Sequence, residues 1–125
     1  MGGGSGGGIS SVSGSLHSNI SNLLARYPHG KDGRLGVPGK NGKANRRVLY
    51  DSKPHTYSKE LFQKLATGAA RVEPLTGKSG FQAFFHDGSN VIWRPISKSG
   101  SPAIDLHLSG KHTDTYRIHF EPKKD

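Results

Sequence analysis

The chain has 125 residues, enough for one domain, and its 18 Lys and Arg against 9 Asp and Glu give a net charge of +9. It contains no cysteine, which excludes disulfides and thiolate metal sites. No stretch approaches the roughly 20 apolar residues of a membrane helix and no signal-peptide pattern begins the chain, so we expect a soluble protein without a membrane partner.

The N-terminal segment divides into a linker and a helix. Residues 1–14 are dominated by Gly and Ser and predict a flexible linker, which leaves a single domain over residues 15–125. Ser13 or Ser15 is placed to cap a helix that ends before Pro28. Its apolar stripe has the spacing of an amphipathic helix and consists of Leu16, Ile20, Leu23, Leu24 and Tyr27.

A basic segment follows this helix. Between Lys31 and Lys64 there are nine basic and three acidic residues, an excess of six positive charges. A phosphate backbone rewards such an excess, because each neutralised phosphate releases counterions. We therefore expect nucleic-acid contacts here, assigned to Lys40, Lys43, Arg46 and Arg47. A solubilising surface is the alternative interpretation.

Two further elements are expected before the main sheet. Residues 46–50 predict a short edge strand. A second helix follows, with Thr56 or Ser58 as its cap and Gly68 at its C-terminal end. Leu61, Phe62 and Leu65 supply its apolar face.

The chain after Gly68 predicts an antiparallel sheet. Five candidate strands, over residues 70–73, 80–86, 90–95, 102–108 and 115–121, are separated by Gly- and Ser-rich turns. A three-residue turn at 87–89 pairs Phe85 with Val91 and Gln82 with Arg94, which keeps the apolar residues on one face. The predicted fold class is α+β, with N-terminal helices packed on a four- to five-stranded antiparallel sheet.

Polar residues recur at strand spacing on the face opposite the expected core. They are Arg94, Asp105, His107, Arg117 and His119, with His86 just upstream. Metal-free RNA cleavage needs a base, an acid and cations around the phosphorane. Histidine serves as base or acid because its pKa lies near neutrality, and arginine grips phosphate through its planar fork. Exposed strand residues without a catalytic role are the alternative.

Individual roles follow from these positions. We assign acid–base catalysis to His119 and His86, phosphate contact to Arg94, and phosphate binding to His107 and Arg117. Asp105 either orients a histidine or pairs with Arg117. A metal site formed by Asp105, His107 and His119 is conceivable, but no metal-binding spacing is present, and we expect neither metal nor cofactor.

The loop between the third and fourth of these strands is stiffened by a proline at each end. It offers hydroxyl and backbone N–H groups to a phosphate. Ser97 and Lys98 are assigned to binding and Ser99 to catalysis, against the alternative of a plain connecting turn.

Three short motifs resemble a known family: Phe-His-Asp-Gly-Ser-Asn-Val-Ile-Trp-Arg-Pro, Ser-Lys-Ser-Gly-Ser-Pro-Ala-Ile-Asp, and Tyr-Arg-Ile-His-Phe. Over about residues 46–121 the chain looks like the C-terminal toxin domains of bacterial polymorphic toxins, of the contact-dependent inhibition and Rhs type. Many of these are similar to the barnase/colicin/RelE-like ribonucleases. The resemblance implies phosphate contact by Arg94, hydroxyl contacts by Ser97 and Ser99, and acid–base work by His119.

The resemblance also implies a biological setting. We expect a secreted or delivered antibacterial domain that cleaves tRNA or rRNA in the target-cell cytoplasm and is neutralised by an acidic immunity protein. Two alternatives remain: a non-catalytic nucleic-acid-binding module, and a metal-dependent DNase toxin. Aromatic residues on the polar face favour the binding module, and only Phe84 is a clear candidate.

Overall fold

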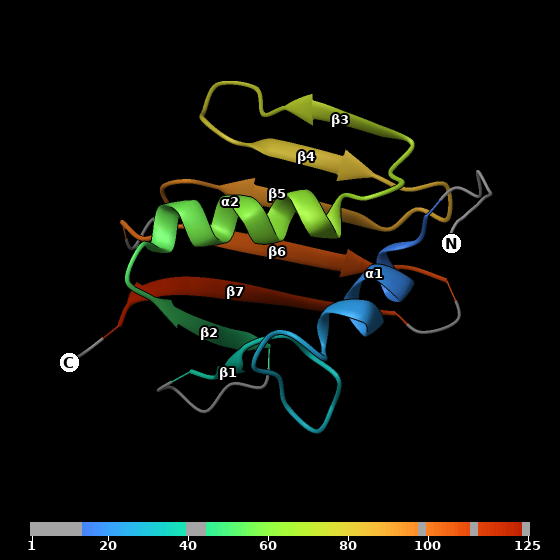
Figure 1. The fold of residues 1–125 in the computed structure, drawn as a ribbon. Coiled ribbons are helices and arrows are strands. Elements are labelled where there is room, and N and C mark those ends of the chain that lie inside the picture. Colours follow the sequence, from blue (N-terminus) through green and yellow to red (C-terminus); the bar gives the residue numbers. More distant parts are fainter. Residues whose placement is uncertain (1–13, 40–44, 98–99, 111–112, 124–125) are drawn as a thin grey trace.

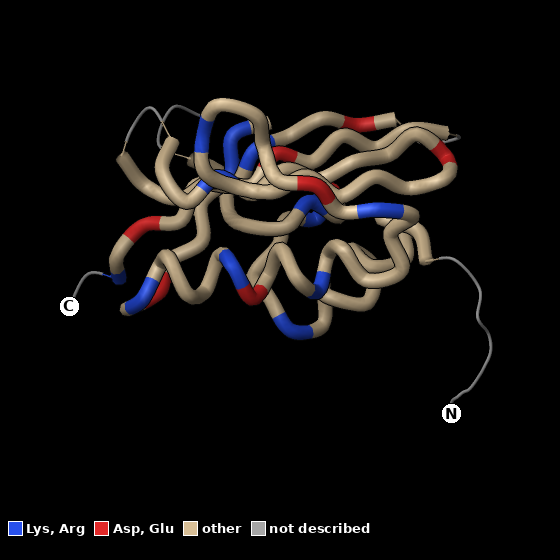
Figure 2. Tube along the Cα trace, turned by 90° about the horizontal axis from the view of Figure 1, so that it is seen from above, with Lys and Arg blue, Asp and Glu red and all other residues tan. Residues whose placement is uncertain are grey.

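The computed structural model describes residues 14–39, 45–97, 100–110 and 113–123, which form one sheet and two helices. Both helices lie on the same side of the sheet, so the molecule has two layers (Figures 1 and 2). We call the face turned toward the helices the inner face and the opposite one the outer face. The elements in chain order are α1 (Leu16–Leu23), β1 (Val37–Pro38), β2 (Arg46–Asp51), α2 (Pro54–Leu65), β3 (Arg71–Pro74), β4 (Phe81–Phe84), β5 (Asn90–Arg94), β6 (Ala103–Leu108) and β7 (Asp114–Pro122).

The sheet has seven strands in the order β1-β2-β7-β6-β5-β4-β3. The α+β class and the antiparallel run from β3 to β7 are confirmed. The prediction of four to five antiparallel strands is wrong, because β2 pairs in parallel with β7 and β1 extends the sheet beyond it. Residues 46–51 are therefore not an edge strand, and the sheet is mixed.

The first helix begins where the sequence predicts and ends earlier. Ser15 is its cap, and its side chain accepts a hydrogen bond from the Ser18 backbone N–H at 3.0 Å. The helix ends at Leu23, with Leu24 as its C-terminal cap. Tyr27 lies beyond the end of the helix. It is nevertheless buried, at 8% exposure, and packs in the core with the apolar residues of the helix.

The second helix begins before the predicted caps. Pro54 occupies the first turn, where its missing N–H costs nothing, and Lys53 precedes it without a side-chain capping bond. Thr56 and Ser58 lie inside the helix. Ser58 is fully buried, where its hydroxyl donates to the His55 carbonyl and accepts from Trp93 Nε1 at 2.9 Å.

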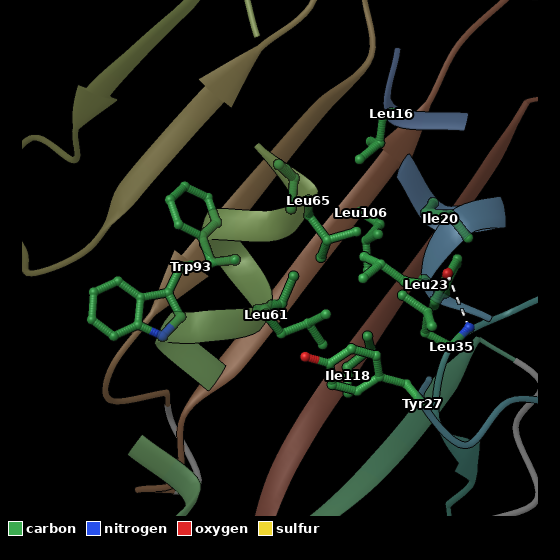
Figure 3. Packing of buried hydrophobic residues seen from close by; sticks show 14 of the residues in the cluster. Leu16, Ile20, Leu23, Tyr27, Leu35, Leu61, Leu65, Trp93, Leu106 and Ile118 are labelled. Atoms are coloured by element: carbon green, nitrogen blue, oxygen red, sulfur yellow. Dashed lines mark hydrogen bonds between the residues drawn. The ribbon is translucent and has the colours of Figure 1, made fainter. Parts of the chain in front are cut away.

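The core lies between the helices and the inner face (Figure 3). Leu16, Ile20 and Leu23 of α1 and Leu61 and Leu65 of α2 meet Trp93, Leu106 and Ile118 of the sheet. Each such side chain contributes about 1.5–3 kcal/mol by leaving water. Burial on the inner face therefore forces the alternating polar residues onto the outer face.

In the β4–β5 hairpin the side chains lie on the predicted faces of the sheet, but the strands pair in a different register. Gln82 pairs with Ile92 and Ala83 with Val91, so the strands are displaced by two residues from the predicted pairing. The turn centres on residues 86–88, with the Phe85 N–H donating to the Ser89 carbonyl at 2.9 Å. Gly88 adopts a φ of 92°, which favours glycine there. A two-residue displacement leaves every side chain on its predicted face.

Candidate active site on the outer face of the sheet

The outer face brings together arginines from three strands. Arg94 lies on β5, Arg117 on β7 and Arg46 at the start of β2. Their strand neighbours Trp93 and Ile118 are buried in the core, so alternation turns the arginines outward. Parallel pairing of β2 with β7 sets Arg46 beside Arg117, and Arg46 enters the site only through this pairing.

One buried carboxylate lies between two of these arginines. Asp105 on β6 is 6% exposed and pairs with Arg117 across the strands. Arg117 Nη2 donates to Asp105 Oδ2 at 3.2 Å, and Arg117 Nε contacts Oδ1. Arg94 Nε lies 3.2 Å from Oδ2, which is an ion-pair distance without hydrogen-bond geometry. We call Arg46, Arg94, Arg117 and Asp105 the outer-face cluster; it carries three cations and one anion.

His119 lies beside this cluster, one row along the sheet. It is opposite Ala103 on β6, and Ala103 is opposite Arg94 on β5. Adjacent strands are about 4.8 Å apart, so the Cα atoms of His119 and Arg94 are separated by about 10 Å. Ala103 projects only a methyl group and is fully buried between these two positions.

The environment of His119 favours the neutral imidazole. Burial lowers the pKa of His119 below its ordinary value, and the positive charges of Arg46 and Arg117 lower it further, while Glu121 and Asp105 oppose them. Its Nε2 atom is buried and makes no hydrogen bond with the described residues. A neutral histidine with an uncommitted ring nitrogen is suited to accept a proton.

The outer-face cluster borders an open depression of about 430 Å³. Its lining consists of Asn45, Arg46, Arg94, Asp105, His107, Thr115, Tyr116 and Arg117. His119 stands beside the depression and is not part of its lining. The depression is therefore a cationic surface, and the histidine is not among its lining residues.

His107 shares the outer face but lies at the other end of the cluster. It is opposite Thr115, four residues before His119 on β7, which places the two histidines about 13 Å apart along the strands. Asp105, His107 and His119 therefore do not converge on one point. Among the described residues no group of three His, Asp or Glu side chains is arranged to hold a metal ion.

Ser97 begins the turn between β5 and β6. Its backbone N–H donates to the Ser101 carbonyl, and the Gly100 N–H donates to the Ser97 carbonyl, both at 2.9 Å. This turn follows Arg94 directly, at the end of the sheet where His119 lies. Four predicted site residues, Lys40, Lys43, Lys98 and Ser99, lie outside the described residues and remain predictions.

The assignment of Arg47 to nucleic-acid binding is wrong. Arg47 is 2% exposed, because alternation turns it to the inner side of β2, where its Nη2 donates to the Gly36 carbonyl at 2.8 Å. Its Nη1 lies 3.6 Å from Asp32 Oδ2. A side chain committed in this way cannot reach a phosphate on the outer face.

His86 does not join His119 as the sequence predicts. It is exposed in the β4–β5 turn, beyond the Phe84–Asn90 pair. Counting along the sheet places it three strands and three rows from His119, or about 25 Å. The two histidines therefore cannot act on the same phosphate.

The described basic residues between Lys31 and Lys64 include arginines in ion pairs and lysines on the surface of the helical layer. Arg34 forms a bidentate pair with Asp114, at 2.8 Å from Nε and 2.7 Å from Nη2, which holds the pKa of that carboxyl below its usual range. Asp32 lies within 3.8 Å of both Arg34 and Arg47. We call Arg34, Arg47, Asp32 and Asp114 the loop cluster. Lys53, Lys59 and Lys64 lie at or on α2, in the helical layer away from the outer face.

The sequence analysis did not predict three residues that line the depression, Asn45, Thr115 and the buried Tyr116. Thr115 precedes Arg117 by two positions, so alternation alone was sufficient to place it on the outer face. Asn45 comes from the far end of the chain, and its carbonyl accepts from the Arg117 N–H at 3.0 Å. Nothing local in the sequence signals that contact, because it depends on the parallel pairing.

Comparison of the chain with protein-family models, with curated proteins and with solved structures finds no match. In the part of the chain that the structure describes, no helix has the length and apolar character needed to cross a membrane. The functional argument therefore rests on the geometry of the outer face.

Proposed function

We propose that the outer face binds RNA and cleaves it without a metal ion, by transphosphorylation. The observation that carries the proposal is the neutral, half-buried His119 with an uncommitted Nε2, beside arginines that outnumber their carboxylate. General bases are effective when their pKa lies near or below the working pH, and guanidinium groups match phosphate oxygens.

In the proposed reaction the His119 imidazole takes the proton of the ribose 2′-hydroxyl, which requires that RNA binding expose its buried Nε2 atom. The 2′-oxygen forms a bond to phosphorus, the bond from phosphorus to the 5′-oxygen breaks, and the leaving oxygen takes a proton from water. The products are a 2′,3′-cyclic phosphate and a 5′-hydroxyl. Arg94 and Arg117, held by Asp105, stabilise the charge that develops on the non-bridging oxygens.

The decisive experiment incubates the purified domain with RNA in excess EDTA and identifies the new ends. We expect cyclic phosphate ends, and we expect His119→Ala to remove them while RNA binding remains. The matched control is His86→Ala, which changes an exposed histidine about 25 Å from His119. Cleavage that is abolished by EDTA would instead favour a metal-dependent nuclease.

A non-catalytic nucleic-acid-binding module is the second candidate. The observation in its favour is that His119 does not line the depression, while Arg94 and Arg117 are already paired with Asp105. In such a module the arginines would follow a phosphate backbone without acting on it. Equal binding and no cleavage by the wild type and His119→Ala would favour this candidate.

We further propose that the domain is an antibacterial effector which acts in the target-cell cytoplasm and is neutralised by an acidic immunity protein. The excess of cations in the outer-face cluster supports a negatively charged partner on that face, since charge complementarity speeds association. Inducible expression in bacteria should arrest growth and cleave tRNA or rRNA, and His119→Ala should relieve the arrest. A partner bound to the helical layer, with the outer face open, would contradict this surface.

A further inference from the structure

Beyond the arginines, the outer face carries a second polar group on β4 and β5. Gln82 and Asn90 occupy diagonal positions on the two strands, and Gln82 Nε2 donates to Asn90 Oδ1 at 3.1 Å. Both side chains are partly buried. Neither Gln82 Oε1 nor Asn90 Nδ2 makes a hydrogen bond within the described residues, so the pair presents one acceptor and one donor outward.

A flat stack adjoins this amide pair. Phe84 is opposite Asn90, and the Arg71 guanidinium lies over the Phe84 ring at 4.2 Å from its centroid. Arg71 is 61% exposed, and Glu73 on the same strand pairs with it. Aromatic rings and guanidinium planes are the groups on which unstacked bases rest.

The amide pair lies at a useful distance from the outer-face cluster. Asn90 and Arg117 are two strands and one row apart, or about 12 Å. His107, opposite Asn90 on β6, lies between them and lines the depression. A strand held at its phosphate by the arginines could extend a neighbouring base over β5 and β4.

We propose that Gln82 and Asn90 form a subsite that recognises adenine in single-stranded RNA. This inference rests on the proposed function and names the base that the same face selects. Asn and Gln carboxamides commonly pair with adenine through its N6 amino donor and its N7 acceptor. The Arg71–Phe84 stack supplies the surface beside which the base lies.

The test measures equilibrium binding by fluorescence anisotropy, with labelled oligo(A), oligo(C) and oligo(U) and the His119→Ala protein, so that cleavage does not interfere. We expect oligo(A) to bind at least about fivefold tighter than oligo(U), the lower limit for a good bidentate contact to a base. Gln82→Ala should reduce that ratio to within about twofold while oligo(U) affinity is kept, because phosphate contacts are unchanged.

Asn90→Asp provides a second variant that keeps the local packing. It retains the oxygen that accepts from Gln82 but loses the Nδ2 donor, so the oligo(A)/oligo(U) ratio should fall even if the added charge weakens both. The matched controls are Gln63→Ala and Asn22→Ala, two exposed amides on the helical layer, which should leave the ratio unchanged.

The outcomes separate the subsite from the catalytic proposal. Equal affinity for the three oligonucleotides, or an adenine preference that persists in both variants, overturns the subsite even if the wild type cleaves RNA. An adenine preference that both variants remove supports the subsite even if the wild type proves unable to cleave. A protein that binds none of the oligonucleotides refutes both proposals.

Discussion

The loop cluster and the outer-face cluster are both built from arginine and aspartate side chains, but their charge balance differs. In the loop cluster two arginines meet two aspartates, and its buried arginine also bonds a backbone carbonyl. In the outer-face cluster one aspartate contacts Arg94 and Arg117, and Arg46 adds a third cation that no aspartate of the cluster contacts. Balanced charge fixes the loop before β2 against the sheet. Unbalanced charge leaves cations able to bind an anion, and this imbalance is the basis for proposing a function on the outer face.

The largest effect that this comparison predicts concerns His119, which lies beside the outer-face cluster. His119→Ala should lower the rate of RNA cleavage by about 10² to 10⁴, the usual contribution of a positioned base. The readout is the single-turnover rate, with anisotropy to show that RNA affinity stays within a few-fold. Near-wild-type cleavage by this variant would reduce His119 to a surface residue.

Arg94→Lys tests whether the geometry of the outer-face cluster matters as well as its charge. Lysine keeps the positive charge but loses the planar fork that matches two phosphate oxygens. We expect kcat to fall by about tenfold or more with KM changed by a few-fold, because preorganised donors act mainly on the transition state. If kcat holds and KM alone rises, Arg94 is a simple backbone contact.

The neighbours Arg46 and Arg47 belong to different clusters, so they form a direct pair of variants. Arg47→Ala should lower the free energy of unfolding by about 2 kcal/mol, because it leaves the buried Gly36 carbonyl without its donor. Arg46→Ala should change stability by less than about 0.5 kcal/mol. It should instead reduce the slope of log affinity against log salt by about 0.7, the loss of one contact to single-stranded phosphate.

Urea denaturation and salt-dependent binding measure these two effects separately. An Arg47 variant that folds normally and weakens RNA binding, or an Arg46 variant that unfolds, would reverse the assignment of the clusters.

The smallest expected effect is that of pH on the cleavage rate and on the stability of the fold. Burial and neighbouring arginines lower the pKa of His119 below its ordinary value of 6.5, so cleavage should persist below pH 6.5 and decline only as the imidazole becomes protonated. The unfolded chain binds the proton more readily, so His119 should also cost stability as pH falls through 6.5 toward the folded pKa. Rate profiles and thermal melts across this range, compared with His119→Gln, measure both; an activity midpoint above 6.5 would contradict the assignment.

Alternation was sufficient to predict which residues face outward. Arg94, Arg117 and His119 lie on the outer face because their apolar neighbours fill the core. Alternation with a period of two also explains the error in the β4–β5 register. A displacement by two residues leaves every side chain on the same face, so the hydrophobic pattern cannot distinguish the two registers.

The remaining errors arise from contacts between distant parts of the chain. The partners of β2 in β7 lie about 70 residues away, and no local pattern indicates a parallel neighbour. Arg47 was assigned to nucleic-acid binding because arginine is usually exposed. Its buried acceptor is the Gly36 carbonyl, which the fold of the preceding loop brings to it. Counting charges in the sequence therefore overestimated how many basic residues of this segment are available for binding.

The position of β7 inside the sheet determines when the outer face can form. This strand is the last of the seven in the sequence, yet it lies between β2 and β6 and carries Arg117 and His119. Ribosomes deliver a chain from its N-terminus, so Arg46 and Arg94 emerge without the strand that joins them. A nascent chain therefore holds an unassembled site until residues 114–122 have been released, which would delay any nuclease activity until synthesis has passed that point.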